Sequence, residues 1–274
     1  MDTSVEISDI RHWVEDQMIR GRYIFTKQDV LDFGLPIKEV SVNRSLQRLE
    51  AKGIIMSPWQ NFYVAVATEF RLKGIVPPSF YIDRLMAFLG RDYYVSHLTA
   101  ASLNGASHQI AMVFQTMVNG GPIRSGVKNG TRLEFTLRQN LPLEFTHKVK
   151  TRSGYMTVAD AELTALDVVA DCRKVGGLSR AAELLVELCE QTKWDEGKLP
   201  LLKYFSIATI QRLGFMLDLI EEREQADSLF MLMRQTGKTV RKVLLKQTSP
   251  VTDDMPVDDR WKVIVNYKLE IDEI

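Results

Sequence analysis

Apolar and polar positions in the first part of the chain follow three short helical patterns and then a strand pattern. Apolar residues recur at helical spacing over residues 7–20. Thr26 is a favourable N-cap for a second helix over residues 27–33. A third helix is expected over residues 37–52, and two apolar runs around a turn at residues 58–61 predict a β-hairpin. Three short helices and a hairpin, in this order, are typical of a winged helix-turn-helix domain.

The third predicted helix has an apolar face and a polar face. Val42, Leu46 and Leu49 fall at i, i+4 and i+7 and form the inward face. The polar face carries the candidate DNA-binding residues Lys38, Ser41, Arg44, Ser45, Arg48 and Lys52. A recognition helix needs short hydrogen-bonding side chains beside Arg or Lys, which bind base edges and phosphates. Any solvated helix face can carry these residue types, but the helix before it and the hairpin after it favour DNA binding.

Two features of the same segment oppose DNA binding. Residues 1–70 hold 8 Lys and Arg against 10 Asp and Glu, a formal net charge of −2. Protein–DNA affinity depends on phosphate neutralisation, so a domain with few cations binds weakly by itself. The tip of the predicted hairpin, residues 57–61, also contains no Lys or Arg. A winged helix that does not bind DNA is therefore the alternative.

The order of the predicted elements divides the chain into two domains. We expect an α+β protein, with a winged helix-turn-helix domain over residues 1–70, a linker over residues 71–80 and a mixed α/β domain over residues 81–274. Pro77 and Pro78 disfavour a regular helix in the linker and favour extended chain. An amphipathic helix over residues 81–89 then begins the second domain.

A long stretch without charge follows that helix. Residues 93–123 contain no Lys, Arg, Asp or Glu. Polar side chains interrupt this stretch too often for the ~20 consecutive apolar residues of a membrane span. We therefore expect a buried segment of a soluble domain, with a strand at residues 93–95 and a helix over residues 98–103. Its polar side chains must find hydrogen-bond partners inside the protein.

Strand patterns and a local excess of cations follow the charge-free stretch. Strands are expected at residues 113–118, 131–137, 148–152 and 155–158. Residues 81–150 hold 8 Lys and Arg against 4 Asp and Glu, a net charge of +4. Half of these cations are candidate secondary phosphate contacts, namely Arg124, Lys128, Arg132 and Arg138. An ordinary solvated strand surface explains scattered cations equally well.

Helical patterns dominate the remainder. Helices are expected over residues 159–170, 180–191, 199–204, 207–222 and 226–233. Ser179 is expected to cap the second of them. Thr164 and Asp167 are interpreted as capping and packing groups rather than catalysts. A last strand over residues 261–267 alternates enough to pair with the sheet.

Three phrases of the second domain resemble the AbiEi antitoxin family, which are bacterial transcriptional regulators of type IV toxin–antitoxin systems. The phrases are YYVSHLTAASLNGASHQ at residues 93–109, TVADAELTALDVV at residues 157–169 with Gly176-Gly177-Leu178 after it, and WKVIVNYKLEID at residues 261–272. The resemblance covers most of residues 80–274. Family members commonly have a basic residue with Gly before the wing tyrosine, where this chain has Asn61 and Phe62.

The resemblance implies binding to operator inverted repeats in double-stranded DNA upstream of the protein's own operon. It also implies a C-terminal domain that carries antitoxin activity and assists DNA binding. The functional partner is expected to be a nucleotidyltransferase-like toxin, which the family counteracts without necessarily forming a stable complex.

The sequence shows no catalytic constellation, cofactor motif or metal-ligand spacing. The four His residues are scattered, and His97 and His108 are interpreted as core or rim residues whose ring nitrogens have hydrogen-bond partners. Lys238 lies in a Thr-Gly-Lys-Thr phrase that lacks the upstream Gly of a phosphate-binding loop. Cys172 and Cys189 are too few for a secreted disulfide scaffold, so free thiols are expected. Without a signal peptide, the expected compartment is the cytoplasm.

Two functions follow from these observations. The first is a DNA-binding transcriptional autorepressor that is also the antitoxin of a type IV, abortive-infection system in phage defence. The second is a non-catalytic protein-interaction module whose winged helix does not bind DNA. A nucleotidyltransferase gene immediately downstream favours the first.

Overall fold

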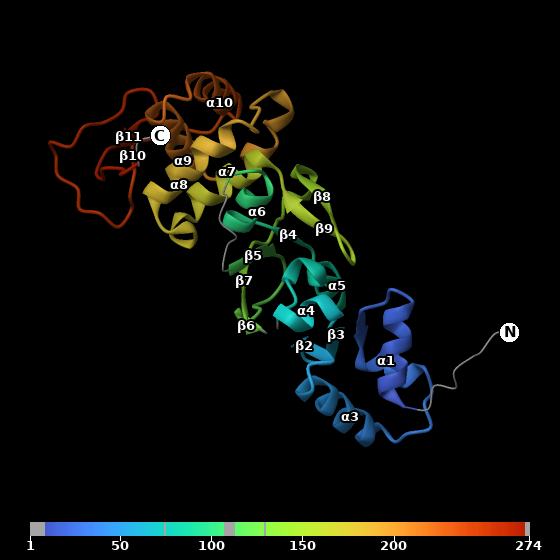
Figure 1. Cartoon of the computed structure of the whole chain (residues 1–274). Coiled ribbons are helices and arrows are strands. Elements are labelled where there is room, and N and C mark those ends of the chain that lie inside the picture. The colour runs from blue at the N-terminus through green and yellow to red at the C-terminus, as the bar shows by residue number, and fades with distance from the viewer. Residues whose placement is uncertain (1–8, 74, 107–112, 129, 272–274) are drawn as a thin grey trace. The chain divides into compact units, whose positions relative to one another are not determined.

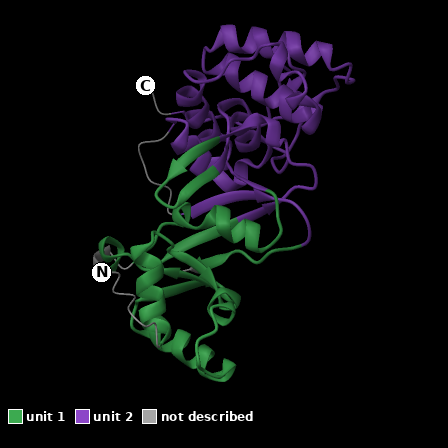
Figure 2. Cartoon of the chain, turned by 90° about the vertical axis from the view of Figure 1, so that its right-hand side faces the viewer, with its two compact units in different colours: residues 1–92, 122–134, 148–156 green, residues 93–121, 135–147, 157–274 purple. Residues whose placement is uncertain are grey.

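The computed structural model describes residues 9–73, 75–106, 113–128 and 130–271 (Figure 1). The chain divides into two compact units (Figure 2). The first unit comprises residues 1–92, 122–134 and 148–156, and the second comprises residues 93–121, 135–147 and 157–274. The chain combines helices with β-sheets, which confirms the expected α+β class.

The first unit begins with three helices and a small sheet. The elements are α1 (Ile10–Ile19), β1 (Ile24–Thr26), α2 (Lys27–Asp32), α3 (Glu39–Ala51), β2 (Ile55–Trp59) and β3 (Phe62–Ala65). The strands are antiparallel in the order β1-β3-β2, and Val64 in the central strand lies opposite both Ile24 and Met56. Apolar residues from the helices and strands form one buried core, including Ile10, Trp13, Val14, Phe25, Val30, Val42, Leu46 and Ile55.

Local signals set the ends of α2 and α3 as the sequence predicted. The Thr26 backbone N–H donates to Asp29 Oδ2 at 2.6 Å, and the Asp29 backbone N–H donates to Thr26 Oγ1 at 3.1 Å. This reciprocal pair is a capping box, which satisfies N–H groups at the start of α2. Gly53 follows α3 with a φ of +65°, a conformation that favours glycine.

The segment expected to be an extended linker contains a helix, α4 (Thr68–Lys73). A 3-10 turn, η1 (Pro78–Phe80), and helix α5 (Ile82–Phe88) follow it. The prolines restrict residues 76–78, which come after α4, so they do not prevent helix formation earlier. The first unit also contains strand β6 (Gly126–Lys128).

A six-stranded sheet has the order β6-β7-β5-β4-β9-β8. Its remaining strands are β4 (Tyr93–Val95), β5 (Val113–Val118), β7 (Thr131–Leu137), β8 (Thr146–Thr151) and β9 (Gly154–Ala159). Strand β4 lies inside the sheet, antiparallel to β5 and parallel to β9. All three of its residues are buried, as expected for this part of the charge-free stretch.

The second unit contains helices that pack around a central one, α7, together with several 3-10 turns. They are α6 (His97–Leu103), α7 (Ala161–Ala170), α8 (Leu178–Cys189), α9 (Ile207–Leu219) and α10 (Arg223–Gln235), with 3-10 turns η2 (Leu143–Phe145), η3 (Cys172–Val175), η4 (Glu196–Lys198) and η5 (Leu201–Tyr204). Because α7 contacts α6, α8 and α9, nearly all of its side chains are buried. In the described part of the chain, no helix is long and apolar enough to cross a membrane.

Two expectations about the second unit were wrong. Ser179 does not cap α8, because the helix begins at Leu178 and Gly177 is the N-cap residue. The terminal segment does not join the six-stranded sheet. Its strand β11 (Val263–Ile264) pairs in parallel with β10 (Val243–Leu244) to form a separate two-stranded sheet.

Replacing Gly214 with Ala is expected to destabilise the second unit. A Cβ atom at Gly214 in α9 would lie 2.1 Å from Cη2 of Trp261, whose side chain is fully buried. Trp261 Nε1 also donates to Asp218 Oδ2 at 2.6 Å, so the ring cannot move without losing that bond. Overpacking of this kind costs about 2–3 kcal/mol. Urea denaturation measures the loss, and Ser228→Ala in α10 is the control. A stability equal to the wild type would contradict the packing.

Candidate nucleic-acid interface

Helix α3 presents one buried face and one exposed face. Val42, Leu46 and Leu49 are buried in the core of the first unit, as the helical spacing predicted. Among the candidate DNA-binding residues, Lys38, Ser41, Arg44, Arg48 and Lys52 are exposed, and Ser45 is half-buried. The structure therefore brings five of the six candidates to the solvent side of one helix.

The two arginines of α3 are available to bind a ligand. Arg44 and Arg48 lie one turn apart, and neither guanidinium forms a hydrogen bond or ion pair with any residue that the structure describes. A guanidinium without a carboxylate partner can contact a guanine edge or a phosphate without first breaking an internal ion pair.

Sequence analysis missed two amide side chains on the same face. Asn43 and Gln47 are exposed and lie one turn apart beside Arg44. An Asn or Gln amide both donates and accepts, which suits the hydrogen-bonding edge of adenine. Their i, i+4 spacing in the sequence could have indicated that the two amides lie on one side of the helix.

The acidic residue at the start of α3 is paired. Lys27 Nζ lies 2.7 Å from Glu39 Oε1, and this hydrogen bond holds the pKa of the Glu39 carboxyl below its usual value. The pair also joins the start of α2 to the start of α3. Repulsion between Glu39 and a phosphate backbone is therefore reduced.

The β2–β3 hairpin is compact and lacks cations. Its turn places Asn61 at a φ of +62°, a left-handed conformation that Asn tolerates better than most residues. Ser57 Oγ donates to the Trp59 carbonyl at 2.8 Å. Residues 55–65 contain no Lys or Arg, so any phosphate contact from the hairpin must come from neutral groups.

The candidate secondary phosphate contacts fall into two groups. Arg124, Lys128 and Arg132 belong to the first unit, the unit that contains α3. Arg124 and Arg132 are exposed, and the side chain of Lys128 lies outside the described set. Arg138 belongs to the second unit, and its guanidinium is committed to internal contacts. We therefore leave Arg138 out of the candidate interface.

The two units carry opposite net charges. The first holds 18 Lys and Arg against 13 Asp and Glu, a formal charge of +5. The second unit holds 17 Lys and Arg against 22 Asp and Glu, a formal charge of −5. The net charge of the whole chain is zero because a basic unit and an acidic unit balance, and α3 belongs to the basic unit.

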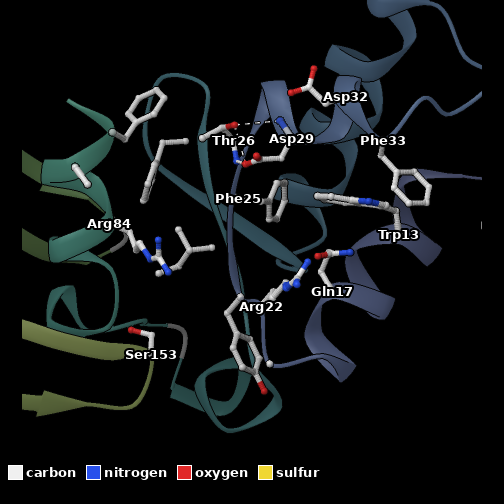
Figure 3. Close-up of a pocket in the computed structure, with 16 residues that line it drawn as sticks. Trp13, Gln17, Arg22, Phe25, Thr26, Asp29, Asp32, Phe33, Arg84 and Ser153 are labelled. Carbon is white, nitrogen blue, oxygen red and sulfur yellow. Dashed lines mark hydrogen bonds between the residues drawn. The ribbon is translucent and has the colours of Figure 1, made fainter. Parts of the chain in front are cut away.

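A pocket of about 650 Å³ lies in the first unit but not on α3 (Figure 3). Trp13, Phe25 and Phe33 lie beside one another in its wall, with ring centroids of Trp13 and Phe25 5.2 Å apart. Thr26 and Asp29 of the capping box also line it. None of its lining residues comes from α3, so this pocket is distinct from the candidate interface.

Arg138 belongs to a buried hydrogen-bond network in the second unit. Its Nη1 donates to Asp167 Oδ1 at 3.0 Å and to Tyr94 Oη at 3.2 Å, and its Nη2 donates to the Tyr204 carbonyl at 2.9 Å. Tyr94 Oη donates to Asp167 Oδ2 at 3.0 Å. The guanidinium also lies 4.2 Å from the centroid of the Phe205 ring. Burial raises the pKa of Asp167 to about 6, against the opposing attraction of His97 and Arg138.

Other polar side chains of the charge-free stretch are also satisfied. His97 is fully buried, with Nδ1 2.8 Å from Ser96 Oγ and Nε2 3.3 Å from Asp171 Oδ2. Asn104 Nδ2 donates to the Ala159 carbonyl at 2.9 Å and to Thr164 Oγ1 at 3.3 Å. The interpretation of His97 as a core residue with a satisfied ring is confirmed, while His108 lies outside the described residues.

These polar groups connect β4 and α6 to α7. Thr164 and Asp167 take part in packing and hydrogen bonding, as the sequence predicted. Within the described ranges, no group of His, Cys, Asp or Glu residues could hold a metal ion, and Cys172 and Cys189 are free thiols.

The fold is similar to that of a solved structure. The crystal structure of the RV2827C protein from Mycobacterium tuberculosis has a similar fold, with a TM-score of 0.67 over 93% of this chain and 90% of that chain, at 12% sequence identity. Both are mixed helix-and-sheet proteins over nearly their full length. No curated protein matches the sequence.

The family model of the AbiEi antitoxin C-terminal domain matches residues 94–219. This matched segment supports the resemblance of the chain to the AbiEi antitoxin family. The match begins inside the phrase at residues 93–109 and includes the phrase at residues 157–169. The terminal phrase at residues 261–272 lies outside the matched range. A match to an antitoxin domain suggests a role in a toxin–antitoxin system.

Proposed function

We propose that this protein is a DNA-binding transcriptional autorepressor and the antitoxin of a type IV toxin–antitoxin system. In this proposal α1, α2, α3 and the β2–β3 hairpin form a winged helix-turn-helix, and α3 binds operator DNA in the major groove. The observation that carries the proposal is the exposed face of α3. It presents unpaired Arg44 and Arg48 beside Asn43 and Gln47, in a unit with a net charge of +5.

The antitoxin part of the proposal rests on the family match over residues 94–219, most of which belong to the second unit. We propose that this domain counteracts a nucleotidyltransferase-like toxin and has no catalytic activity of its own. The domain lies in the cytoplasm in this proposal, where toxin and operator are both accessible. The earlier division into residues 1–70, 71–80 and 81–274 is retained as the proposed functional division.

The second candidate function is an interaction module that does not bind DNA. It is favoured by the hairpin at residues 55–65, which offers no cation, and by the −2 charge of residues 1–70. The two candidates differ in whether cations elsewhere in the first unit contribute to DNA affinity.

Reversing Arg124, Lys128 and Arg132 to Glu is expected to weaken binding to all DNA sequences alike. Phosphate contacts carry no direct sequence information. Each phosphate contact adds ~0.9 to the slope of log K against log salt concentration, so the triple variant should lose up to about 2.7 of that slope. Fluorescence anisotropy at several salt concentrations measures it.

The matched control reverses three exposed cations of the second unit, Arg223, Arg234 and Lys242. An unchanged slope in the Arg124, Lys128 and Arg132 variant would show that these residues are ordinary solvated surface. Extra affinity would then come from cooperativity between protein copies on repeated sites.

A further inference from the structure

A cavity of about 480 Å³ in the second unit gathers four cations from three separate places in the chain. Arg173 and Lys174 come from η3, Arg212 from α9, and Lys246 from the segment after β10. Asp171 is the one carboxylate among the residues that line it. The unit as a whole has a formal charge of −5, so this local excess of cations is opposite to its surroundings.

The single carboxylate offsets only part of the charge of these four cations, and Lys174 is among the groups that attract it. Asp171 Oδ2 lies 3.3 Å from His97 Nε2, and that hydrogen bond holds the pKa of Asp171 below its usual value. Asp171 is therefore ionised, but it faces a buried imidazole. Four cations around one cavity repel one another, and an anion placed among them would remove that repulsion.

Arg212 gives the strongest indication of a ligand. Its side chain is half-buried, and its Nε donates to the Leu244 carbonyl at 2.8 Å. No carboxylate in the described part of the chain pairs with it. Burial lowers the pKa of its guanidinium, which means that the charge lacks adequate solvation. A bound anion would stabilise a partly desolvated guanidinium, and the planar arrangement of its N–H donors matches phosphate oxygens.

The backbone beside Arg212 supplies further donors. Gly176 and Gly177 have φ values of +102° and +109°, which lead the chain directly into α8. The N-cap residue of α8 is Gly177, which has no side chain to accept from the first-turn N–H groups. Lys246 also lines the cavity, with its Nζ 3.7 Å from the centroid of the Tyr267 ring.

We propose that this cavity binds a small polyphosphate ligand of the nucleoside triphosphate class. Four cations match the charge of a triphosphate better than that of a single small anion. The volume lies in the range of about 300–1,000 Å³ that is usual for small-molecule sites. The site is in the antitoxin domain and does not involve α3, so it is independent of DNA binding.

Isothermal titration of the full-length protein tests the proposal with GTP, ATP, pyrophosphate and inorganic phosphate. We expect triphosphates to bind more tightly than inorganic phosphate. Arg212→Gln should weaken triphosphate binding at least about tenfold, the usual scale for loss of a charged hydrogen bond. Arg173→Gln should also weaken binding. Because Arg173 is exposed, this variant should fold normally and keeps the test valid if the Arg212 variant misfolds. The matched control is Arg234→Gln on α10.

Comparison of the probes shows whether the cavity recognises the phosphate chain alone or also the nucleoside. Equal binding of GTP and pyrophosphate supports a site for polyphosphate alone, and tighter binding of nucleotides supports contacts to the nucleoside. Binding that is unchanged in both Arg212→Gln and Arg173→Gln would overturn the proposal. So would the absence of heat from every probe at about 1 mM. Binding only to DNA oligonucleotides would assign the cations to a nucleic-acid surface instead.

Discussion

Arg44→Ala combined with Arg48→Ala should abolish operator binding while the circular dichroism spectrum stays native. Each bidentate contact of Arg with a base is worth ~1–3 kcal/mol. Losing both contacts therefore weakens binding by about 30-fold to 10⁴-fold. Both side chains are exposed and unpaired in the described structure, so their removal should change stability by less than about 0.5 kcal/mol. An electrophoretic shift assay measures the loss.

The matched control replaces Arg11 and Arg20 with Ala. Arg11 lies on α1 and Arg20 is its C-cap residue; both are exposed and are paired with Glu15 and Asp16, respectively. The control changes the net charge equally but leaves α3 intact, so it should retain operator binding. Wild-type affinity in the Arg44 and Arg48 variant would contradict the assignment of α3 as the recognition helix. The same variant should still neutralise the toxin, because the antitoxin domain is unchanged.

Arg138→Met is expected to destabilise the second unit by about 3–5 kcal/mol at neutral pH. The substitution keeps an apolar chain of similar length over Phe205 but removes the donors to Asp167, Tyr94 and the Tyr204 carbonyl. The Asp167 carboxylate would then be buried with Tyr94 as its remaining hydrogen-bond donor. Denaturation in urea measures the loss. Arg132→Met, at an exposed position on β7, is the control and should change little.

The cost of Arg138→Met should depend on pH in a defined direction. The pKa of Asp167 is raised from 3.8 to about 6, so this group favours folding most at low pH and loses that contribution as pH rises through 6. Removing Arg138 takes away an attraction that lowers this pKa. The variant should therefore lose less stability at about pH 5, where Asp167 is protonated, than at about pH 7.5. An equal loss at both pH values would show that the ion pair does not stabilise the fold.

Sequence patterns predicted those elements whose ends depend on nearby residues. Thr26 and Asp29 form the cap of α2 within four residues, and the inward face of α3 follows from i, i+4, i+7 spacing. Both features are local, so the pattern contains the information needed. The start of α8 was misplaced because Ser179 is a good cap in general. Here Gly177 adopts a positive φ and is the N-cap residue, so α8 begins at Leu178, two residues before the expected start at residue 180.

Contacts between residues far apart in sequence could not be predicted. Arg138 was grouped with three other cations by its position near a strand, yet its partner Asp167 lies 29 residues away. The strand β11 has the alternation of a sheet strand, but alternation does not specify which strand it pairs with. The cation cavity likewise joins residues 173, 212 and 246, which no local pattern connects.

DNase I footprinting on the DNA upstream of the protein's own gene tests the central claim most directly. The proposed autorepressor should protect an inverted repeat, because α3 presents both exposed amides and unpaired arginines in a basic unit. Protection should disappear in the Arg44 and Arg48 double variant at the same protein concentration. If the wild type protects no upstream site, or protects unrelated DNA equally well, the protein is not an operator-binding autorepressor.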